Sequence, residues 1–157
     1  RLFARRYLQQ RTWRMSMLDT NLLGRLTDSD DPQCPAARKA MQTLLAEGEQ
    51  LVIVPQNLYE FWAIATRTST ANGLGLTTEQ TSQWLKYFQR RFTLLADPQD
   101  LPSRWHELVK AKGIKGFRSY DARLVAAMQC YGIDRLLTFN GTDFSGLGIT
   151  VIDPTSI

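Results

Sequence analysis

Four acidic side chains stand where a carboxylate could do chemistry. Asp19 and Asp143 each follow a short apolar run typical of a buried strand, whereas Glu60 and Asp121 stand in the first part of helical patterns. Four carboxylates in one cleft would repel one another, so a pKa must rise or a cation must neutralise them. Mg²⁺ and Mn²⁺ prefer oxygen ligands, activate water and stabilise charge on a phosphoryl group. The acids therefore point to a metal-dependent nuclease or phosphohydrolase.

Each of these acids also has an ordinary structural interpretation. A carboxylate in the first turn of a helix is favoured by the unpaired N–H groups and the helix dipole, so Asp121 could be a helix cap. Asp143 could stabilise the turn at Asn140-Gly141. The residue types alone leave both interpretations open, and the elements that position the acids matter more.

Short apolar runs alternate with helical patterns along the chain. The expected strands are residues 15–18, 51–54, 92–95, 135–139 and 149–152. The expected helices are residues 21–26, a helix from Asp31-Pro32 towards Gly48, a helix from Pro55, and residues 79–91, 101–112 and 122–131. Strands separated by helices predict an α/β fold with a mostly parallel sheet of about five strands and helices on both faces.

Local signals predict several element boundaries. Asp31 is expected to be the N-cap of its helix with Pro32 at the first position, and Thr77 with Gln80 resembles a capping box. Residues 69–76 and 113–119 are expected to be loops, the second of them basic. Ligands of such sheets bind at the carboxyl ends of the strands, so the residues just after the strands are the candidate site.

The composition fits one globular domain of 157 residues and excludes several classes of protein. No apolar run approaches the roughly 20 residues that span a bilayer, and no secretory apolar segment is present. The two cysteines, Cys34 and Cys130, lie far apart in the sequence, which disfavours a disulfide framework or a Cys-based zinc site and fits the cytoplasm. A single histidine, His106, leaves carboxylates as the expected catalytic groups.

The net charge of +4 is concentrated at the N-terminus. Residues 1–14 hold five arginines and no acid, whereas residues 15–157 hold 14 basic and 15 acidic residues and sum to −1. Residues 1–14 are expected to be an extension outside the domain, added or from an upstream reading frame. A basic arm that touches RNA and an amphipathic surface helix are the alternatives.

The context of the four acids resembles the PIN-domain family, specifically the VapC-type ribonuclease toxins. The resemblance rests on residues 18–23 (LDTNLL), Pro55-Gln56 with Tyr59-Glu60-Phe61, residues 120–127 (YDARLVAA), and residues 137–140 (LTFN) with Asp143-Phe144 followed by Gly148-Ile149. These segments occur in the family's order and cover about residues 15–154. One departure is Tyr120, where many relatives have His; we expect it to be peripheral to activity.

The resemblance implies a compact three-layer α/β/α sandwich over residues 15–157 and a metal-dependent endoribonuclease. Its acidic quartet maps onto Asp19, Glu60, Asp121 and Asp143, which would bind Mg²⁺ or Mn²⁺, the first and third directly. Thr20 or Asn21, and Asn140, would support the carboxylates or the metal-bound water. The implied reaction leaves 5′-phosphate and 3′-hydroxyl ends. The implied partners are an RNA substrate, a cognate antitoxin protein and a second copy in a homodimer, with no membrane.

Basic and aromatic residues supply weaker candidates for binding. Lys112, Lys115 and Arg118 would bring positive charge beside Asp121, where RNA phosphates pass, and are equally explained as a solvated loop. Arg67 and Arg123 are weaker candidates of the same kind. The aromatic residues are expected in the core or at an interface rather than as base-stacking platforms: Phe61, Trp62, Trp84, Tyr87 and Phe88.

Other functions remain as alternatives. A catalytically inactive PIN-like module that binds RNA or protein would bind no metal, and a PIN nuclease of RNA processing would have no antitoxin. A phosphatase of the haloacid-dehalogenase type needs a second Asp two residues after the first, where this chain has Asn21. A receiver domain needs an acidic pair beside Asp19, which is missing.

Overall fold

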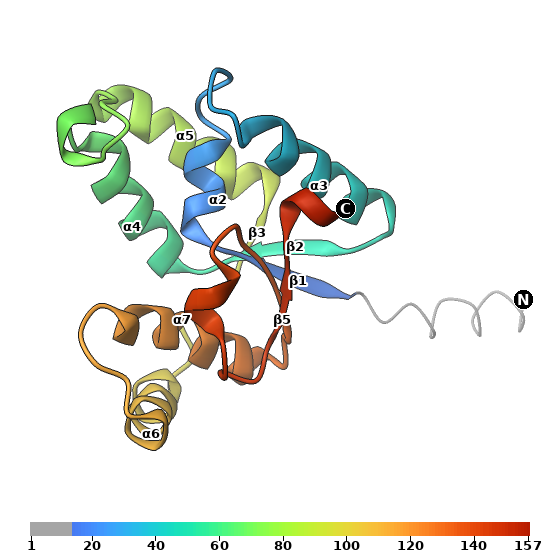
Figure 1. The fold of residues 1–157 in the computed structure, drawn as a ribbon, viewed down its shortest axis with the longest axis vertical. Helices are drawn as coiled ribbons and strands as arrows, with labels where there is room; N and C mark the ends of the chain where they lie inside the picture. The colour runs from blue at the N-terminus through green and yellow to red at the C-terminus, as the bar shows by residue number, and fades with distance from the viewer. Residues whose placement is uncertain (1–13) are drawn as a thin grey trace, which may run out of the picture.

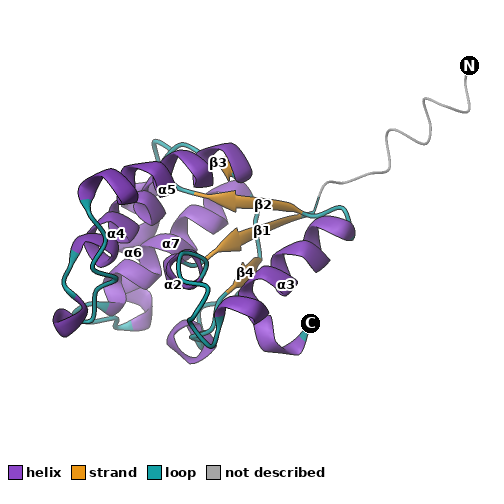
Figure 2. Cartoon of the chain, turned by 90° about the horizontal axis from the view of Figure 1, so that it is seen from above, coloured by secondary structure: helices purple, strands orange, loops and turns teal. Residues whose placement is uncertain are grey.

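A five-stranded sheet forms the centre of the protein (Figure 1). The computed structural model describes residues 14–157, so the proposed extension lies almost wholly outside the described residues. The strands are β1 (Met15–Leu18), β2 (Gln50–Ile53), β3 (Thr93–Leu94), β4 (Arg135–Leu137) and β5 (Thr150–Ile152). Every strand pair is parallel, in the order β3-β2-β1-β4-β5, and Figure 2 shows β1 and β2 running the same way.

Helices cover both faces of the sheet. They are α2 (Thr20–Arg25), α3 (Cys34–Ala46), α4 (Pro55–Thr66), α5 (Thr78–Arg91), α6 (Leu101–Lys112) and α7 (Arg118–Tyr131). Single 3₁₀ turns lie at Ser69–Ala71, Gly141–Phe144 and Pro154–Ser156. Helices α2 to α5 contribute to the core on one face, and α6 and α7 to the core on the other (Figure 1). The expected three-layer α/β/α sandwich is confirmed.

Alternation along the strands explains why the sheet is buried on both faces. Leu18, Ile53 and Leu137 belong to the core beneath α2 to α5, whereas their neighbours Met17 and Leu136 belong to the core beneath α6 and α7. Successive side chains of a strand point to opposite faces, so a continuous apolar run is required when helices cover both. Among residues 14–157, none of the helices has the length and apolar character needed to cross a membrane.

The order of the strands places the candidate site. From central β1 the chain builds outward through β2 and β3, then crosses to β4 on the other side of β1 and continues to β5. The strand order therefore reverses between β1 and β4, and ligands of open α/β sheets bind outside the carboxyl ends at such a point. Leu18 pairs with Leu137 there, and the Asp19 amide donates to the Leu137 carbonyl at 3.0 Å.

The start of α3 differs from the expectation. The helix begins at Cys34 with Gln33 as its N-cap, three residues after Asp31. The Asp31 carboxylate accepts a hydrogen bond from the Gln33 amide at 2.8 Å, so it stabilises the turn that precedes the helix. The proline in the first helical turn is Pro35 rather than Pro32.

Helix α7 begins earlier than the sequence suggests. It starts at Arg118 rather than Ala122, so Asp121 lies in its first turn and only residues 113–117 connect it to α6. The Ser119 amide donates to the Gly116 carbonyl, and the Tyr120 amide donates to the Phe117 carbonyl. These turn hydrogen bonds extend the helix backwards through the expected loop. The capping box of α5 is confirmed, with both Thr77–Gln80 hydrogen bonds present.

Candidate active site

Asp19 stands at the junction of β1 and α2, where it is the N-cap of the helix. One carboxylate oxygen accepts the Thr20 amide at 2.8 Å, and the other accepts the Thr138 hydroxyl at 2.7 Å. Burial raises the pKa of Asp19; these two hydrogen bonds oppose the rise and the negative charge of Asp143 adds to it. The ionised form of Asp19 is therefore costly without a cation nearby.

A buried asparagine joins the end of β1 to the start of α4. The Asn57 amide group donates to the Leu18 carbonyl at 3.0 Å and to the Thr20 hydroxyl at 3.2 Å, and its oxygen accepts the Val54 amide at 2.8 Å. The side chain is completely buried. Asn57 thus ties the Leu18 backbone and the Thr20 side chain, on either side of Asp19, to the helix that carries Glu60.

Glu60 is oriented by a side chain one helical turn before it. The Gln56 amide group donates to the Glu60 carboxylate and to the Tyr120 carbonyl, each at 2.8 Å. Burial raises the pKa of Glu60, and the charge of Asp19 adds to this rise, whereas the hydrogen bond from Gln56 opposes it. Gln56 therefore links α4 to the start of α7.

Asp121 shows that the four acids share one electrostatic environment. Its pKa is raised to about 6, first by burial and then by the negative charges of Asp19, Asp143 and Glu60; the Arg118 guanidinium opposes the rise. Each of the other three carboxylates thus acts on Asp121 through space. The structure thus places the four acids that the sequence singled out within electrostatic range of one another.

The Asp143 side chain forms an ion pair with Arg118 at the start of α7. It lies in the 3₁₀ turn Gly141–Phe144, where its carboxylate pairs with the Arg118 guanidinium at 3.2 Å. Arg118 also donates to the Asp143 carbonyl at 3.0 Å. The expectation of a basic loop therefore fails for Arg118, because it is the first residue of α7 and faces the acidic site. Lys112 and Lys115 are exposed.

The predicted supporting residues occupy three different situations. Thr20 is buried and bonded to Asn57. The side-chain oxygen of Asn21 is buried without a hydrogen-bond partner. Asn140 is exposed, and its backbone amide donates to the Thr138 hydroxyl at 3.0 Å. Asn21 is thus the one of these three whose side chain offers a free buried acceptor.

The donor set fits a hard divalent cation. The four acids and Asn21 offer only oxygen atoms, and three of the carboxylates have raised pKa values that a cation would offset. Within residues 14–157, no three Asp, Glu, His or Cys side chains are close enough together to hold one ion. An Mg²⁺ ion needs no such group, because it keeps several waters and takes one or two carboxylates.

Sequence reasoning missed the residues that orient the acids: Gln56, Asn57 and Thr138. Gln56 and Thr138 belong to the segments that carry the family resemblance, and Asn57 lies next to Gln56. A buried polar side chain close behind a strand needs a hydrogen-bond partner, and this requirement could have drawn attention to these residues. The partner itself is visible only in the tertiary structure.

The similarity to known proteins lies in the fold rather than in the sequence as a whole. The sequence matches no family model, and no curated protein is significantly similar to it in sequence. The fold is similar to a DNA-bound VapBC complex of Salmonella typhimurium, with a TM-score of 0.66 and 18% identity over 91% of this chain and 99% of that one. A toxin–antitoxin complex of Klebsiella pneumoniae has a TM-score of 0.61 and 24% identity over 88% and 97% of the two chains.

A third structure with a similar fold belongs to a protein that cleaves RNA. It is a VapC toxin of Mycobacterium tuberculosis that cleaves the sarcin-ricin loop, with a TM-score of 0.64 and 19% identity over 87% of this chain and 96% of that chain. All three likenesses cover nearly the whole of both chains and have the same all-parallel α/β architecture. The chain therefore has the PIN-domain fold of the VapC toxins.

Proposed function

We propose that this protein is an Mg²⁺- or Mn²⁺-dependent endoribonuclease and the toxin of a toxin–antitoxin pair, acting in the cytoplasm. The observation that carries the proposal is that Asp19, Glu60 and Asp143 lie within electrostatic range of Asp121, whose pKa is raised first by burial and then by these three negative charges. The VapC toxin that cleaves the sarcin-ricin loop supports RNA as the substrate.

Each acid has a proposed role in this site. Asp19 and Asp121 would hold the ion directly, and Glu60 and Asp143 would complete the site, the latter through water. When bound, the ion would lower the pKa of a water molecule and stabilise negative charge on the scissile phosphate. The protein keeps the acids in place: Thr138 and the Thr20 amide orient Asp19, and Gln56 orients Glu60.

RNA cleavage with Mn²⁺ tests the proposal. We expect the wild type to cleave single-stranded RNA and Asp19→Asn and Asp121→Asn to lose activity by at least about 100-fold, because each removes a charge that binds the ion. Asp134→Asn is the matched control, since Asp134 is exposed and directly precedes the amino end of β4, whereas the candidate site lies beyond the carboxyl ends of the strands. Equal cleavage by all four proteins would contradict the site. Failure to bind Mn²⁺ at millimolar concentration would instead favour an inactive binding module.

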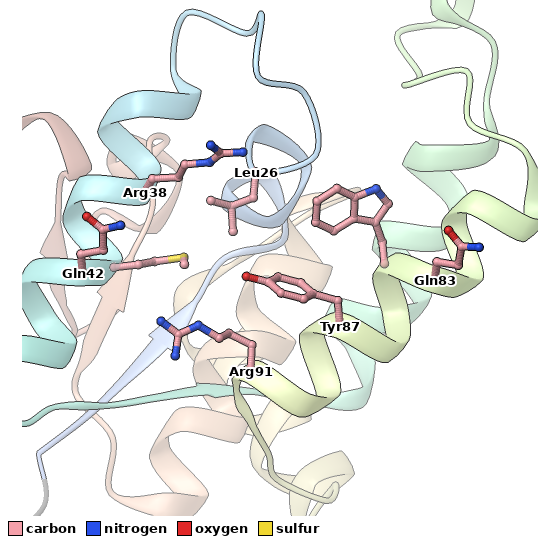
Figure 3. A pocket seen from close by; sticks show the side chains of 8 residues that line it. Leu26, Arg38, Gln42, Gln83, Tyr87 and Arg91 are labelled. Atoms are coloured by element: carbon pink, nitrogen blue, oxygen red, sulfur yellow. The ribbon is translucent and has the colours of Figure 1, made fainter.

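A groove that none of the four acids lines fits the antitoxin. It has a volume of about 550 Å³ and lies between α3 and α5, at the end of α2. Figure 3 shows Leu26 and Tyr87 pointing into it, with the guanidinium groups of Arg38 and Arg91 beside them. An apolar floor with arginines at its rim matches an amphipathic helix that carries acidic residues. Two of the similar structures are complexes of a toxin with its antitoxin, which supports this kind of partner.

Co-purification with the protein encoded beside this gene tests the groove. We expect Arg91→Glu to abolish the complex, because it reverses the charge that an acidic helix would meet. Gln89→Glu, an exposed change on the same helix, should leave the complex intact. Loss of the complex in both variants, or in neither, would place the antitoxin elsewhere.

The proposed homodimer has a separate surface. Tyr59 and Trp62 on α4 are 67% and 38% exposed, whereas Phe61 between them is fully buried against Phe88. Adjacent exposed aromatic side chains are typical of interfaces. We expect light scattering to give a dimer mass for the wild type and a monomer mass for Tyr59→Ser, since the substitution removes apolar contact area. A monomeric wild type would contradict the dimer.

A further inference from the structure

A pocket of about 410 Å³ opens beside the acidic site, and none of the four acids lines it. Its walls come from the segment between β3 and α6, from α6 and from the first turn of α7. The lining residues include Asp97, Pro98, Trp105, Tyr120 and Arg123. The volume is within the range of small-molecule sites and is large enough for one nucleobase.

Two aromatic side chains, Trp105 and Tyr120, are among the residues that line this pocket. The Trp105 indole N–H donates to the Ser119 carbonyl at 2.8 Å, so the ring is fixed with its polar atom satisfied. Tyr120 is 57% exposed at the pocket edge. The Tyr131 hydroxyl donates to the Ala96 carbonyl, which ties the segment before Asp97 to α7. These contacts hold Trp105 and the segment before Asp97 in place, and Tyr120 offers an exposed ring for stacking.

The polar group in the pocket is a balanced ion pair. The Arg123 guanidinium pairs with the Asp97 carboxylate at 3.0 Å, and the two side chains remain 32% and 35% exposed. Because the charges cancel, the pair offers no excess positive charge to a phosphate. It does offer both donors and acceptors, which is what the polar edge of a nucleobase requires.

The pocket is joined to the acidic site by hydrogen bonds. Arg123 donates to the Gln56 side-chain oxygen at 3.4 Å, and Gln56 donates to Glu60 and to the Tyr120 carbonyl. Tyr120 directly precedes Asp121 in α7. A nucleotide whose phosphate lies at the acids would thus have its neighbouring base within reach of the pocket.

We propose that this pocket binds the base of a nucleotide next to the scissile phosphate, with the ring stacked on Tyr120 and Trp105 and its edge at the Arg123–Asp97 pair. Stacking on aromatic side chains and hydrogen bonding of the base edge are the usual means of reading single-stranded RNA. The proposal rests on the proposed ribonuclease function and gives Tyr120, expected from the sequence to be peripheral, a role in binding.

Abasic RNA tests the pocket directly. The probes are fluorescein-labelled RNA hexamers of mixed sequence and the same hexamers with one base removed at each position in turn. Binding is measured by fluorescence anisotropy in EDTA with Asp121→Asn, so that no cleavage occurs. We expect one abasic position to weaken binding by about 5- to 150-fold, the effect typical of replacing a base-stacking aromatic residue by alanine.

Tyr120 variants, made in the same Asp121→Asn background, assign that base to the pocket. Tyr120→Ala should weaken binding of the intact RNA by a similar factor and abolish the penalty of the abasic position, whereas Tyr120→Phe should retain both. His106→Ala, an exposed aromatic on α6 beside Trp105, should behave like the parent. If the abasic penalty survives in Tyr120→Ala, or no position carries one, the pocket does not bind a base.

Cleavage by the wild type with Mn²⁺ separates the two proposals. Cleavage together with a flat abasic series overturns the base pocket alone. Neither binding nor cleavage of RNA overturns both proposals. Unchanged RNA binding in Tyr120→Ala, together with loss of a complex with the antitoxin, overturns the base pocket in favour of a protein segment.

Discussion

The hydroxyl of Thr138 donates a hydrogen bond to the carboxylate of Asp19 at 2.7 Å, although the two residues are 119 positions apart in the chain. They meet because β1 and β4 are neighbours in the sheet and end at the same level. Thr138 is almost completely buried and also accepts the Asn140 amide. A residue that follows β4 thus orients Asp19, which follows β1.

Replacing Thr138 by Val should weaken metal binding. The substitution keeps the shape but removes the donor, so it should raise the pKa of Asp19 further and lower the affinity for Mn²⁺ by about 10-fold or more, as is typical for groups that orient ligands. Isothermal titration calorimetry at pH 7 measures the affinity. Thr138→Ser keeps the hydroxyl and should bind Mn²⁺ like the wild type; a Val variant that also does so would disprove the role.

The stability of the metal-free protein should depend on Asp121. Its pKa of about 6 lies above the ordinary value of 3.8, so the folded state binds this proton more tightly than the unfolded state. The contribution of Asp121 to the free energy of unfolding should therefore fall as the pH rises from about 4 to about 6, and stay low above that. Burial raises the pKa values of Asp19 and Glu60 in the same direction.

Asp121→Asn removes this cost. In EDTA at pH 7.5 we expect the variant to be more stable than the wild type by about 1–2 kcal/mol, a value reduced for the solvent screening of a half-exposed group. At pH 4 the difference should largely vanish. Urea denaturation at the two pH values measures it, with Asp134→Asn as control, and equal differences at both would refute the electrostatic origin.

Asn57 should be more important for folding than any residue of the acidic quartet. Asn57→Ala leaves the Leu18 carbonyl and the Val54 amide without their partners inside the protein, so we expect a loss of about 2–4 kcal/mol in the free energy of unfolding. Chemical denaturation measures the loss. Gln129→Ala, an exposed change on α7, should cost under about 0.5 kcal/mol. A neutral Asn57→Ala would show that water replaces these hydrogen bonds.

Arg118 should affect RNA more than it affects the fold. Its ion pair with Asp143 is exposed, so Arg118→Ala should change stability by less than about 1 kcal/mol. RNA affinity should fall, and the slope of log affinity against log salt should decrease by about one, as for loss of one phosphate contact. Arg118→Lys should keep the slope. Arg104→Ala, which removes another exposed arginine, should leave the slope unchanged.

Much of the architecture follows from local patterns. The apolar runs at β1 and β2 are long enough to bury both faces of a strand. The reciprocal hydrogen bonds of Thr77 and Gln80 fix the start of α5. The boundaries that differ, at α3 and α7, depend on which of several nearby residues make the first turn hydrogen bonds. Asp31 bonds the Gln33 amide instead of capping the helix, and Gly116 and Phe117 accept the first hydrogen bonds before α7.

The sequence by itself determined the α/β class, the order of the elements and the identity of four acids that stand after strands or early in helices. These are properties of single segments, because periodicity and caps act over a few residues. Only the tertiary structure decided that Arg118 pairs with Asp143, that Gln56 and Thr138 orient two of the acids, and that Arg123 and Asp97 face each other beside Tyr120. Three of these contacts, those of Arg118, Thr138 and Arg123, join residues that are 25 to 119 positions apart, and their existence depends on the order of the strands in the sheet.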